Sequence, residues 1–396
     1  MDLSNRASKI SPSLTLAITA KAKKMKESGI SVIGFGAGEP DFNTPDYIIA
    51  GAIDALNKGQ TKYTPSAGIL PLREEICKKF LNDNGLEYTP AQIVVSNGAK
   101  QSLYNAIQAI IDEGDEVIIP SPYWLTYPEL VGLAGGKCVF VKGKSENSYK
   151  MTATEFENAI TDKTKAVIIN SPSNPMGTVY SKDELFAIAK IAEEKGIWII
   201  SDEIYEKLVY EGNKHVSIAT YSEKVKEKTI VINGVSKTYA MTGWRIGYLA
   251  APLHVAKAID SMQSHMTSNA NSIAQYATLT ALKGGKEFLE SMHETFDSRR
   301  KFMVEKLGEI KEVKIVVPVG AFYVMVDISE LKGKCYNGEK INNSIDFADK
   351  LLTKGVAVVP GCSFGDDNFI RLSYAISIED IEEGLNRIKD FISEVN

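Results

Sequence analysis

One lysine, in the segment Gly234-Val235-Ser236-Lys237, has surroundings that suit chemistry. The apolar run 230–232 in front of it is typical of a buried strand, and the small residues of the following turn can hold Lys237 at the base of a cleft. Partial loss of water lowers the pKa of an amine and favours an imine with an aldehyde. Arg245, further along, can return to the same cleft and bind a phosphate with its planar fork. Taken alone, a lysine after such a turn is more often a solvated surface residue.

Polar, aromatic and ionisable residues follow five apolar runs of the chain directly. They occupy residues 96–100, 120–124, 170–175, 201–205 and 233–237. In open α/β sheets, ligands bind at the carboxyl ends of the strands. A sheet that is only structural does not need an aspartate, a lysine and a tryptophan at one edge. The five segments therefore predict a binding site, although they do not name its ligand.

The elements that would position these residues are short β-branched runs, which recur through the middle of the chain. They lie at 93–95, 117–119, 139–141, 167–169, 197–200 and 230–232. Continuous apolar runs indicate strands covered on both faces. Helical patterns at 101–111 and 183–195 lie between them, and strands that alternate with helices predict an α/β fold with a mostly parallel sheet.

The pattern changes from about residue 290 onward. A charged helix is expected at 287–309, strands at 314–317, 321–326, 356–359 and 369–373, and helices at 347–354 and from about 379. This mixture is typical of a smaller α+β domain. We predict a large domain at 46–289 and a small domain built from both termini, 1–45 and 290–396.

The composition indicates an ordinary globular chain. It has 396 residues, of which 44% are hydrophobic and 24% charged, and a net charge of −5 without a dense basic block. Nucleic-acid binding is disfavoured, because it requires a basic surface. No apolar run approaches the roughly 20 residues that span a membrane, and the first residues do not form a secretory signal, so we expect a cytoplasmic protein. The four cysteines and four histidines have no metal-ligand spacing, which predicts free thiols, no metal, and histidines on the surface or on helices.

The segment 234–247 is similar to the pyridoxal-phosphate attachment signature of class I aminotransferases. Further blocks resemble that family in the family's order, at 38–42, 63–68, 171–177, 201–205 and 371–375. Each block is weak by itself, but together they are very specific. The resemblance implies the aspartate-aminotransferase fold (fold type I) with pyridoxal 5'-phosphate as cofactor.

The resemblance also assigns residues to the cofactor ring. Lys237 would form the imine with the cofactor and act as general base and acid. Asp202 would pair with the pyridine nitrogen, whose positive charge makes the ring an electron sink. Tyr205 and Asn174 look like donors to the ring hydroxylate, and Trp124 offers a face for stacking.

The cofactor phosphate requires several donors. Residues that open a helix after a strand can bind an anion through their amides and the helix dipole. The expected donors are Gly98, Ala99, Lys100, Ser236 and Arg245. Tyr63 resembles a tyrosine that reaches the phosphate of a neighbouring subunit, which implies a homodimer with shared active sites.

Fewer residues of the resemblance indicate contacts with the substrate than with the cofactor. Arg371 looks like the residue that binds the substrate α-carboxylate, together with the Gly38 backbone and Asn174. Trp124 is a further expected substrate contact. Many aspartate aminotransferases bind the distal carboxylate with an arginine lent by the partner, but the segment 261–271 contains none here. In the subgroup without it, a lysine placed like Lys100 and a hydroxyl placed like Thr15 take that role. That pair accompanies the use of prephenate as amino acceptor.

The resemblance implies a ping-pong transaminase that exchanges an amino group between L-aspartate and 2-oxoglutarate. Several alternatives stay open: an aspartate or glutamate to prephenate aminotransferase, an aromatic or alanine aminotransferase, and, more remotely, a carbon–sulfur lyase. A ligand sensor fused to a DNA reader is disfavoured, because the chain has no room for an added DNA-binding domain before the first family block.

Overall fold

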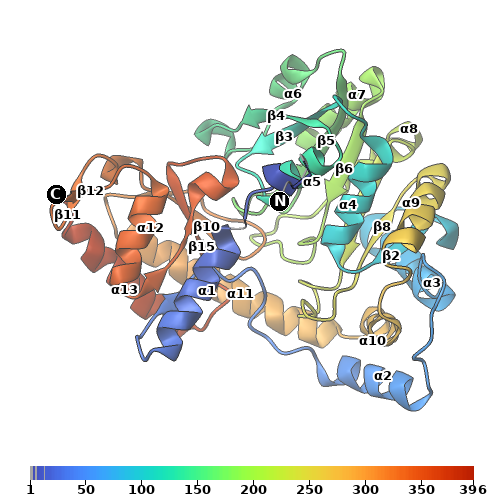
Figure 1. Ribbon diagram of the computed structural model, residues 1–396, viewed down its shortest axis with the longest axis horizontal. Helices are drawn as coiled ribbons and strands as arrows, with labels where there is room; N and C mark the ends of the chain where they lie inside the picture. The colour runs from blue at the N-terminus through green and yellow to red at the C-terminus, as the bar shows by residue number, and fades with distance from the viewer. Residues whose placement is uncertain (1–2, 5–6, 13) are drawn as a thin grey trace.

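A seven-stranded sheet forms the centre of the computed structural model, which describes residues 3–4, 7–12 and 14–396 (Figure 1). Its strands are β2 (Ile93–Ser96), β3 (Glu116–Ser121), β4 (Lys137–Lys142), β5 (Thr164–Asn170), β6 (Trp198–Asp202), β7 (Thr229–Gly234) and β8 (Gly247–Ala250). Their order across the sheet is β2-β8-β7-β6-β5-β3-β4. All six β-branched runs of the middle of the chain are confirmed as strands.

The strand β8 was not predicted. It lies antiparallel between β2 and β7, whereas the other neighbours in the sheet are parallel. Since β2 and β7 run the same way as β3, β4, β5 and β6, the carboxyl ends of six strands meet at one edge. The five polar segments predicted to form a site all begin at that edge.

Helices cover both faces of this sheet, because side chains alternate between the faces along each strand. Val117 and Ile119 pack with α4 (Ala99–Ile110), α5 (Thr126–Leu133) and α9 (Leu253–Met266). Ile118 faces the other side, toward α6 (Ala153–Ala159), α7 (Lys182–Lys195) and α8 (Glu223–Lys226). On that second side the β2 and β8 strands pack against α2 (Asp46–Asn57), α3 (Leu70–Lys79) and α10 (Ser272–Lys283).

The helix α7 shows why such segments become helical. The Ser181 hydroxyl accepts a hydrogen bond from the Glu184 amide over 3.3 Å, and the Glu184 carboxylate accepts one from the Ser181 amide over 2.7 Å. This reciprocal capping box satisfies two amides that the first helical turn leaves without carbonyl partners.

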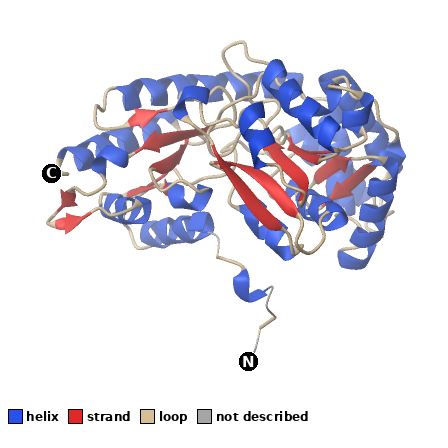
Figure 2. Cartoon of the chain, turned by 90° about the horizontal axis from the view of Figure 1, so that it is seen from above, coloured by secondary structure: helices blue, strands red, loops and turns tan. Residues whose placement is uncertain are grey.

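A second, antiparallel sheet lies to one side of the first. Its strands follow the order β14-β15-β10-β9, with β9 (Lys314–Ile315), β10 (Tyr323–Asp327), β14 (Val359–Pro360) and β15 (Phe369–Ser373). Around it lie α1 (Leu14–Glu27), α12 (Ser344–Thr353) and α13 (Ile378–Ser393), the parallel pair β1 (Ile33–Gly34) and β13 (Val356–Ala357), and the hairpin β11 (Cys335–Tyr336) and β12 (Glu339–Lys340). Figure 2 shows the strands in two groups, each flanked by helices.

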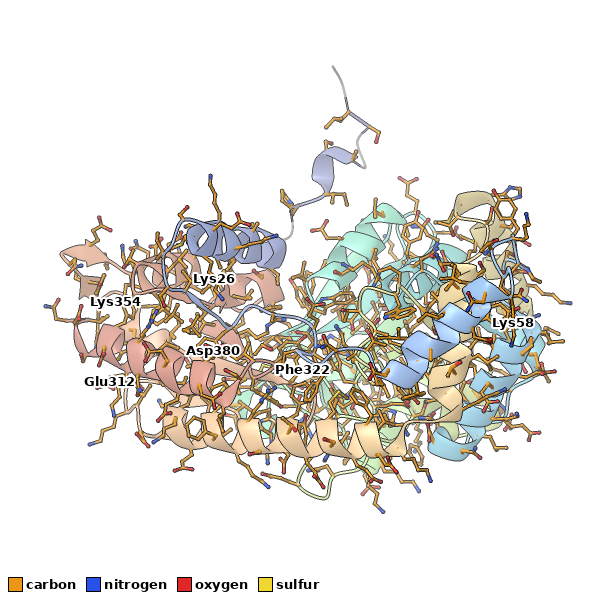
Figure 3. All side chains as sticks on the ribbon, turned by 90° about the horizontal axis from the view of Figure 1, so that it is seen from below. Lys26, Lys58, Glu312, Phe322, Lys354 and Asp380 are labelled. Atoms are coloured by element: carbon orange, nitrogen blue, oxygen red, sulfur yellow. The ribbon has the colours of Figure 1, made fainter. Side chains whose placement is uncertain are left out.

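The long helix α11 (Lys286–Gly308) runs beneath both groups of elements (Figure 3). It begins before residue 290 and therefore crosses the predicted domain boundary without a break, so the division at 289 stays a prediction. The predicted strand 356–359 is two short strands that belong to different sheets, because β13 pairs with β1 and β14 pairs with β15.

Shorter helical turns connect these elements. They are η1 (Ala7–Lys9), the π-helical η2 (Phe80–Asn84), η3 (Pro90–Gln92), η4 (Ser145–Asn147), η5 (Ile218–Thr220), η6 (Ser329–Leu331) and η7 (Gly361–Phe364). Within the described ranges, no helix has the length and apolar character needed to cross a membrane. All four cysteines are free thiols, as expected.

Candidate active site

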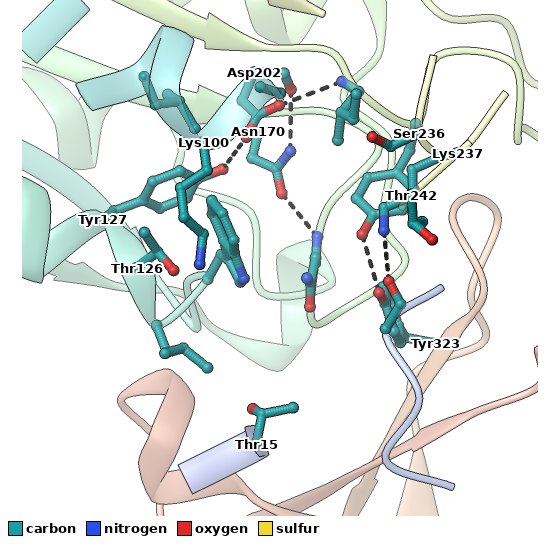
Figure 4. A pocket seen from close by; sticks show the side chains of 18 of the residues that line it. Thr15, Lys100, Thr126, Tyr127, Asn170, Asp202, Ser236, Lys237, Thr242 and Tyr323 are labelled. Atoms are coloured by element: carbon teal, nitrogen blue, oxygen red, sulfur yellow. Dashed lines mark hydrogen bonds between the residues drawn. The ribbon is translucent and has the colours of Figure 1, made fainter. Parts of the chain in front are cut away.

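A cavity of about 390 Å³ opens at the edge where the six strands end. It is lined by residues that follow β2, β3, β5, β6 and β7, and by residues of α1, β10 and β15. Figure 4 shows Lys100, Thr126 and Tyr127 on one side of it and Ser236, Lys237 and Tyr323 on the other. The volume lies in the range of pockets that hold cofactors and other small ligands.

Lys237 projects into this cavity from the turn after β7. Its Nζ donates a hydrogen bond to the Gly38 carbonyl oxygen over 2.5 Å. Burial lowers the pKa of the ammonium to about 8, and the nearby cations Arg245 and Arg371 act in the same direction, while Glu39 opposes them. A lysine with such a pKa is partly a free amine near neutral pH, as a nucleophile or a base must be.

Asp202 is the last residue of β6 and is buried at the floor of the cavity. Its Oδ2 accepts a hydrogen bond from the Tyr127 hydroxyl over 2.7 Å, and its Oδ1 accepts one from the Ile204 amide over 3.3 Å. Burial raises the pKa of the carboxyl to about 6, against the lowering effect of these hydrogen bonds. The carboxylate is therefore mostly ionised at neutral pH and can hold a cationic group.

Arg371 reaches the cavity from β15 and is 2% exposed. Its Nη1 donates to Asn174 Oδ1 over 3.0 Å, and its Nη2 donates to the Gly36 carbonyl over 3.1 Å. The guanidinium centre lies 4.2 Å from the ring centre of Tyr323 and 4.9 Å from that of Phe364. Its buried Nε has no hydrogen-bond partner among the described residues, so the fork retains donors for a carboxylate.

The first turn of α4 has amides of the kind that can bind an anion. The amides of Ala99 and Lys100 lie in that turn, where a helix offers them no carbonyl. The Gly98 amide is used differently from the expectation, because it donates to the Ser96 carbonyl over 2.8 Å. Gly98 has φ +86°, and a Cβ there would lie 2.3 Å from Arg245 Nη2. Glycine therefore lets the exposed Arg245 side chain reach the helix end.

Gly247, the first residue of β8, allows the same close approach from the sheet. A Cβ at this position would lie 2.1 Å from the Ala99 nitrogen, a distance that real side chains do not show. The strand can therefore press directly against the start of α4 only because it begins with glycine.

Two further predicted residues, Lys100 and Trp124, lie close together in the lining of the cavity. Lys100 Nζ lies 5.0 Å from the ring centre of Trp124, and burial and Arg245 lower the pKa of its ammonium. Thr15, on α1, also lines the cavity (Figure 4). Ser236 is buried and lines it next to Lys237.

Tyr205 also lines the cavity, and its hydroxyl lies 3.0 Å from that of Tyr323. Tyr63 does not line it in this chain, and 90% of its surface is exposed. All the other predicted residues line one cavity, except Gly98, which directly precedes the lining residues Ala99 and Lys100.

Several cavity residues received no individual role from the sequence, among them Tyr127, Asn170 and Tyr323. Asn170 is the last residue of β5 and begins the segment 170–175, which was predicted as part of a binding site. Its Nδ2 donates to the Asp202 carbonyl over 3.0 Å. Tyr323 lies on the other sheet and had no local signal.

A buried ionic cluster lies next to the site, formed by Glu203, Glu206, His215 and Lys79. His215 Nε2 lies 3.0 Å from Glu203 Oε2, and Lys79 forms an ion pair with Glu206. The expectation that each histidine lies on the surface or on a helix was wrong for His215, whose side chain is 7% exposed and belongs to a loop. The acidic and histidine groups lie close enough to suit a metal, but Lys79 already forms an ion pair with Glu206. Burial lowers the pKa of His215, but Glu203 and Glu206 outweigh it and raise that pKa, which favours the cationic imidazolium beside both carboxylates.

Comparison with known proteins defines the class. The pattern of the family described as "Aminotransferase class I and II" matches residues 30–388, and the chain belongs to this family. It is 54% identical to the aspartate aminotransferase of Bacillus sp. (strain YM-2) over 392 residues, covering 98% of this chain and 99% of that protein. It is 48% identical to the probable aspartate/prephenate aminotransferase of Aquifex aeolicus (strain VF5), covering 99% of each. The crystal structure of the aspartate aminotransferase from Rhizobium meliloti matches with a TM-score of 0.96 at 41% identity, covering 100% of both chains.

The predicted fold and family are thus confirmed, and the family uses pyridoxal phosphate. The cavity fits this cofactor on its own chemistry. It offers an amine of lowered pKa for an aldehyde, a buried carboxylate for a ring nitrogen, and a helix start with Arg245 for a phosphate.

Proposed function

We propose that this aminotransferase moves the amino group of L-aspartate to 2-oxoglutarate, giving oxaloacetate and L-glutamate, by a ping-pong mechanism. The observation that carries the proposal is that one cavity contains both Arg371 and Lys100 besides Lys237. Two cations in one cavity suit a substrate with two carboxylates. The names of the relatives reported above agree with this substrate.

Pyridoxal phosphate, when bound, supplies the aldehyde that accepts the amino group and a ring that delocalises negative charge. Lys237 Nζ lies in the cavity as a partly deprotonated amine, and we assign it to remove the proton from the substrate Cα. The buried carboxylate of Asp202 holds the proton on the pyridine nitrogen, because a neutral nitrogen would leave that carboxylate without a counter-charge.

The other cofactor contacts follow from the same cavity. We assign Tyr205 and Asn174 to the ring oxygen and Trp124 to the ring face. The amides of Ala99 and Lys100, the Ser236 hydroxyl and the Arg245 guanidinium are assigned to the phosphate. Gly98 contributes through the room it leaves for Arg245.

Substrate contacts use the donors that the protein leaves available. Arg371 would bind the α-carboxylate, with Asn174 and the Gly38 backbone beside it, since Asn174 already orients the guanidinium. Lys100 would bind the distal carboxylate and Thr15 would assist from α1, as both line the cavity.

A second candidate function replaces 2-oxoglutarate by prephenate as the acceptor. Two observations favour it: Thr15 and Lys100 line one cavity, and a relative at 48% identity is named a probable aspartate/prephenate aminotransferase. Prephenate also carries two carboxylates, so the same two cations suit it.

We also propose that two copies of the chain form a dimer with shared sites. Tyr63 is a large aromatic side chain with 90% of its surface exposed, and α2 exposes an apolar stripe of Ile49, Ile53 and Leu56. Exposed apolar surface of this kind marks interaction sites. Tyr63 would reach the cofactor phosphate of the partner.

The division of the chain into a large domain, 46–289, and a small domain built from both termini, 1–45 and 290–396, is also part of the proposal.

The visible absorption spectrum of the purified protein tests the proposed reaction. A cofactor band should be present, should change on addition of L-aspartate, and should be restored by 2-oxoglutarate. Prephenate compared with 2-oxoglutarate in the last step separates the two candidate acceptors. A bound-cofactor band that does not respond to aspartate would contradict the substrate. No band after supply of pyridoxal phosphate would contradict the cofactor assignment.

A further inference from the structure

Tyr323, on β10, contacts two of the residues to which we assign roles. Its hydroxyl oxygen lies 3.0 Å from that of Tyr205, and its ring centre lies 4.2 Å from the Arg371 guanidinium. The side chain is 1% exposed and its ring meets the Tyr205 ring edge-on at 5.9 Å. Buried between two site residues, it cannot move without affecting them.

The register of the second sheet explains the contact with Arg371. In the antiparallel pair β10–β15, Tyr323 lies opposite Ser373 and Met325 lies opposite Arg371. Tyr323 and Arg371 are therefore diagonal neighbours on one face of the sheet, within reach for long side chains. The ring face of Tyr323 supports the guanidinium as a cation–π contact.

Binding of the cofactor would determine which hydroxyl donates in the hydrogen bond between Tyr323 and Tyr205. A hydroxyl has one proton to donate, and neither of these two hydroxyls has another hydrogen-bond partner among the described residues. If Tyr205 donates its proton to the cofactor's ring oxygen, it has none left for Tyr323. Tyr323 must then be the donor and Tyr205 the acceptor.

We propose that Tyr323 is a positioning residue that connects the two halves of the site: its hydroxyl donates to Tyr205, and its ring supports Arg371. This inference rests on the proposed function, because it takes the assigned roles of Tyr205 and Arg371 as given. A tyrosine oxygen that accepts a hydrogen bond becomes a stronger donor itself. With the cofactor bound, Tyr323 would therefore stabilise negative charge on the cofactor's ring oxygen through Tyr205.

Among the described residues, three charged groups interact with this pair of tyrosines: Arg371 on β15, Asp202 on β6, and Glu39 in the N-terminal segment. Lys237, after β7, lines the same cavity. None of them hydrogen-bonds to either tyrosine hydroxyl. Removal of the Tyr323 hydroxyl therefore acts through Tyr205 and leaves these groups in place.

The test measures the pH midpoint of the visible absorption of the cofactor-loaded enzyme without substrate. Tyr323→Phe removes the hydroxyl and keeps the ring, so negative charge on the ring oxygen is less well stabilised. The midpoint should rise by about 0.5 pH unit, since the cofactor then holds its proton more tightly. Tyr374→Phe is the matched control, because the Tyr374 hydroxyl is also buried but donates to the Ala321 carbonyl, over 3.0 Å, away from the cavity.

A double-mutant cycle makes the test specific. Tyr205→Phe should raise the midpoint by itself, and Tyr323→Phe should add almost nothing in that background. A separate measurement tests the contact between the Tyr323 ring and Arg371: the affinity of the enzyme for maleate, an unreactive dicarboxylate, by calorimetry. Tyr323→Phe should leave the affinity for maleate nearly unchanged. Tyr323→Leu should weaken it about fivefold, because Arg371 loses the aromatic face.

The outcomes separate this inference from the proposed function. If the wild-type enzyme shows a cofactor band that responds to aspartate, but Tyr323→Phe leaves the midpoint unchanged, the inference is overturned and the proposed function stands. A shift that adds fully to that of Tyr205→Phe, or an equal shift in Tyr374→Phe, also overturns it. A wild-type enzyme without a cofactor band removes the proposed function and the inference together.

Discussion

The Tyr127 hydroxyl donates a hydrogen bond to Asp202 Oδ2 over 2.7 Å, and both side chains are buried. This bond stabilises the ionised carboxylate, which burial by itself disfavours. The carboxylate that is expected to hold the pyridine nitrogen thus depends on a tyrosine from α5.

We expect Tyr127→Phe to raise the pKa of Asp202 above its value of about 6 and to weaken binding of pyridoxal phosphate about tenfold at pH 7. The loss should be larger at pH 6 than at pH 8, because the carboxyl is protonated more fully at the lower pH. Absorbance titration of the apoenzyme measures the affinity. Tyr180→Phe, a buried tyrosine outside the main cavity, is the control. Equal affinities of Tyr127→Phe and wild type at pH 6 would refute the role.

The lowered pKa of Lys237 predicts how fast the apoenzyme captures its cofactor. Only the free amine attacks an aldehyde, so the capture rate should rise with pH and level off above about 8. Stopped-flow absorbance after mixing with pyridoxal phosphate gives the rate. Lys237→Ala should not capture the cofactor covalently and should lose turnover by at least about 10³-fold. Lys214→Ala is the control, because Lys214 is an exposed lysine. A capture rate that does not change between pH 6.5 and 9.5 would contradict the lowered pKa of Lys237.

Lys100 should discriminate between substrates with one and two carboxylates. We expect Lys100→Ala to raise the Michaelis constant for aspartate by about tenfold or more, because one charge-assisted hydrogen bond to the substrate is lost. The Michaelis constant for alanine should change little. Lys100→Arg should recover part of the loss. Steady-state kinetics with both amino acids measures the effect, and an equal increase for the two would exclude the assigned role.

Tyr63 allows the shared site to be tested directly. Tyr63→Ala and Lys237→Ala should each have low activity, but subunit exchange between them should restore activity, because in a two-fold dimer one of the two sites then carries neither change. The measurement is the activity of the mixture after dissociation and reassembly, against an unexchanged mixture. No recovery in a mixture shown to contain hybrid dimers would rule out a shared site.

The buried Glu206 carboxylate predicts part of the acid sensitivity of the fold. Burial would raise its pKa, but Lys79, His215 and Lys207 lower it to about 2. A group with a depressed pKa contributes stability above its ordinary pKa of 4.5, and that contribution is lost as the pH falls toward 2.

The change that tests this is Glu206→Gln, which should flatten the fall in unfolding free energy between pH 4.5 and 2. Lys79→Met should destabilise the protein by about 3 kcal/mol at pH 7, because it leaves a buried charge unpaired. Urea unfolding at several pH values between 2 and 7 measures both effects. Parallel curves for Glu206→Gln and wild type would show that the carboxylate does not contribute.

The parts of the molecule that sequence reasoning predicted are those with local signals. Six strands of the central sheet were continuous apolar runs, and the polar residues after them were visible as strand ends. The β8 strand was missed because it is short, starts with glycine and runs antiparallel between two parallel strands. The predicted strand 356–359 is divided at Val358 into two short strands of different sheets. This division could not be predicted, because it depends on pairing partners far away in the chain.

The same distinction applies to the site. Lys237, Asp202 and Arg371 stand in recognisable motifs, and they meet in one cavity. Tyr323 could not be predicted, because its contact with Arg371 depends on the pairing of β10 with β15, and its contact with Tyr205 arises only when the second sheet packs against the first. Tyr127 is a helical residue that the pattern alone cannot distinguish from an ordinary core tyrosine.

Arg371 donates to Asn174 and to the Gly36 carbonyl, two points that lie far before it in the chain. A chain is synthesised from its N-terminus, and its earlier parts can fold first. The last strand of the central sheet ends at Ala250, so this sheet is complete while Arg371 is still unmade. A nascent chain thus has the lysine and the carboxylate of the site before it has the guanidinium. The contact that we propose between Arg371 and the substrate α-carboxylate would therefore become available only after the central sheet, with Lys237 and Asp202, has been synthesised.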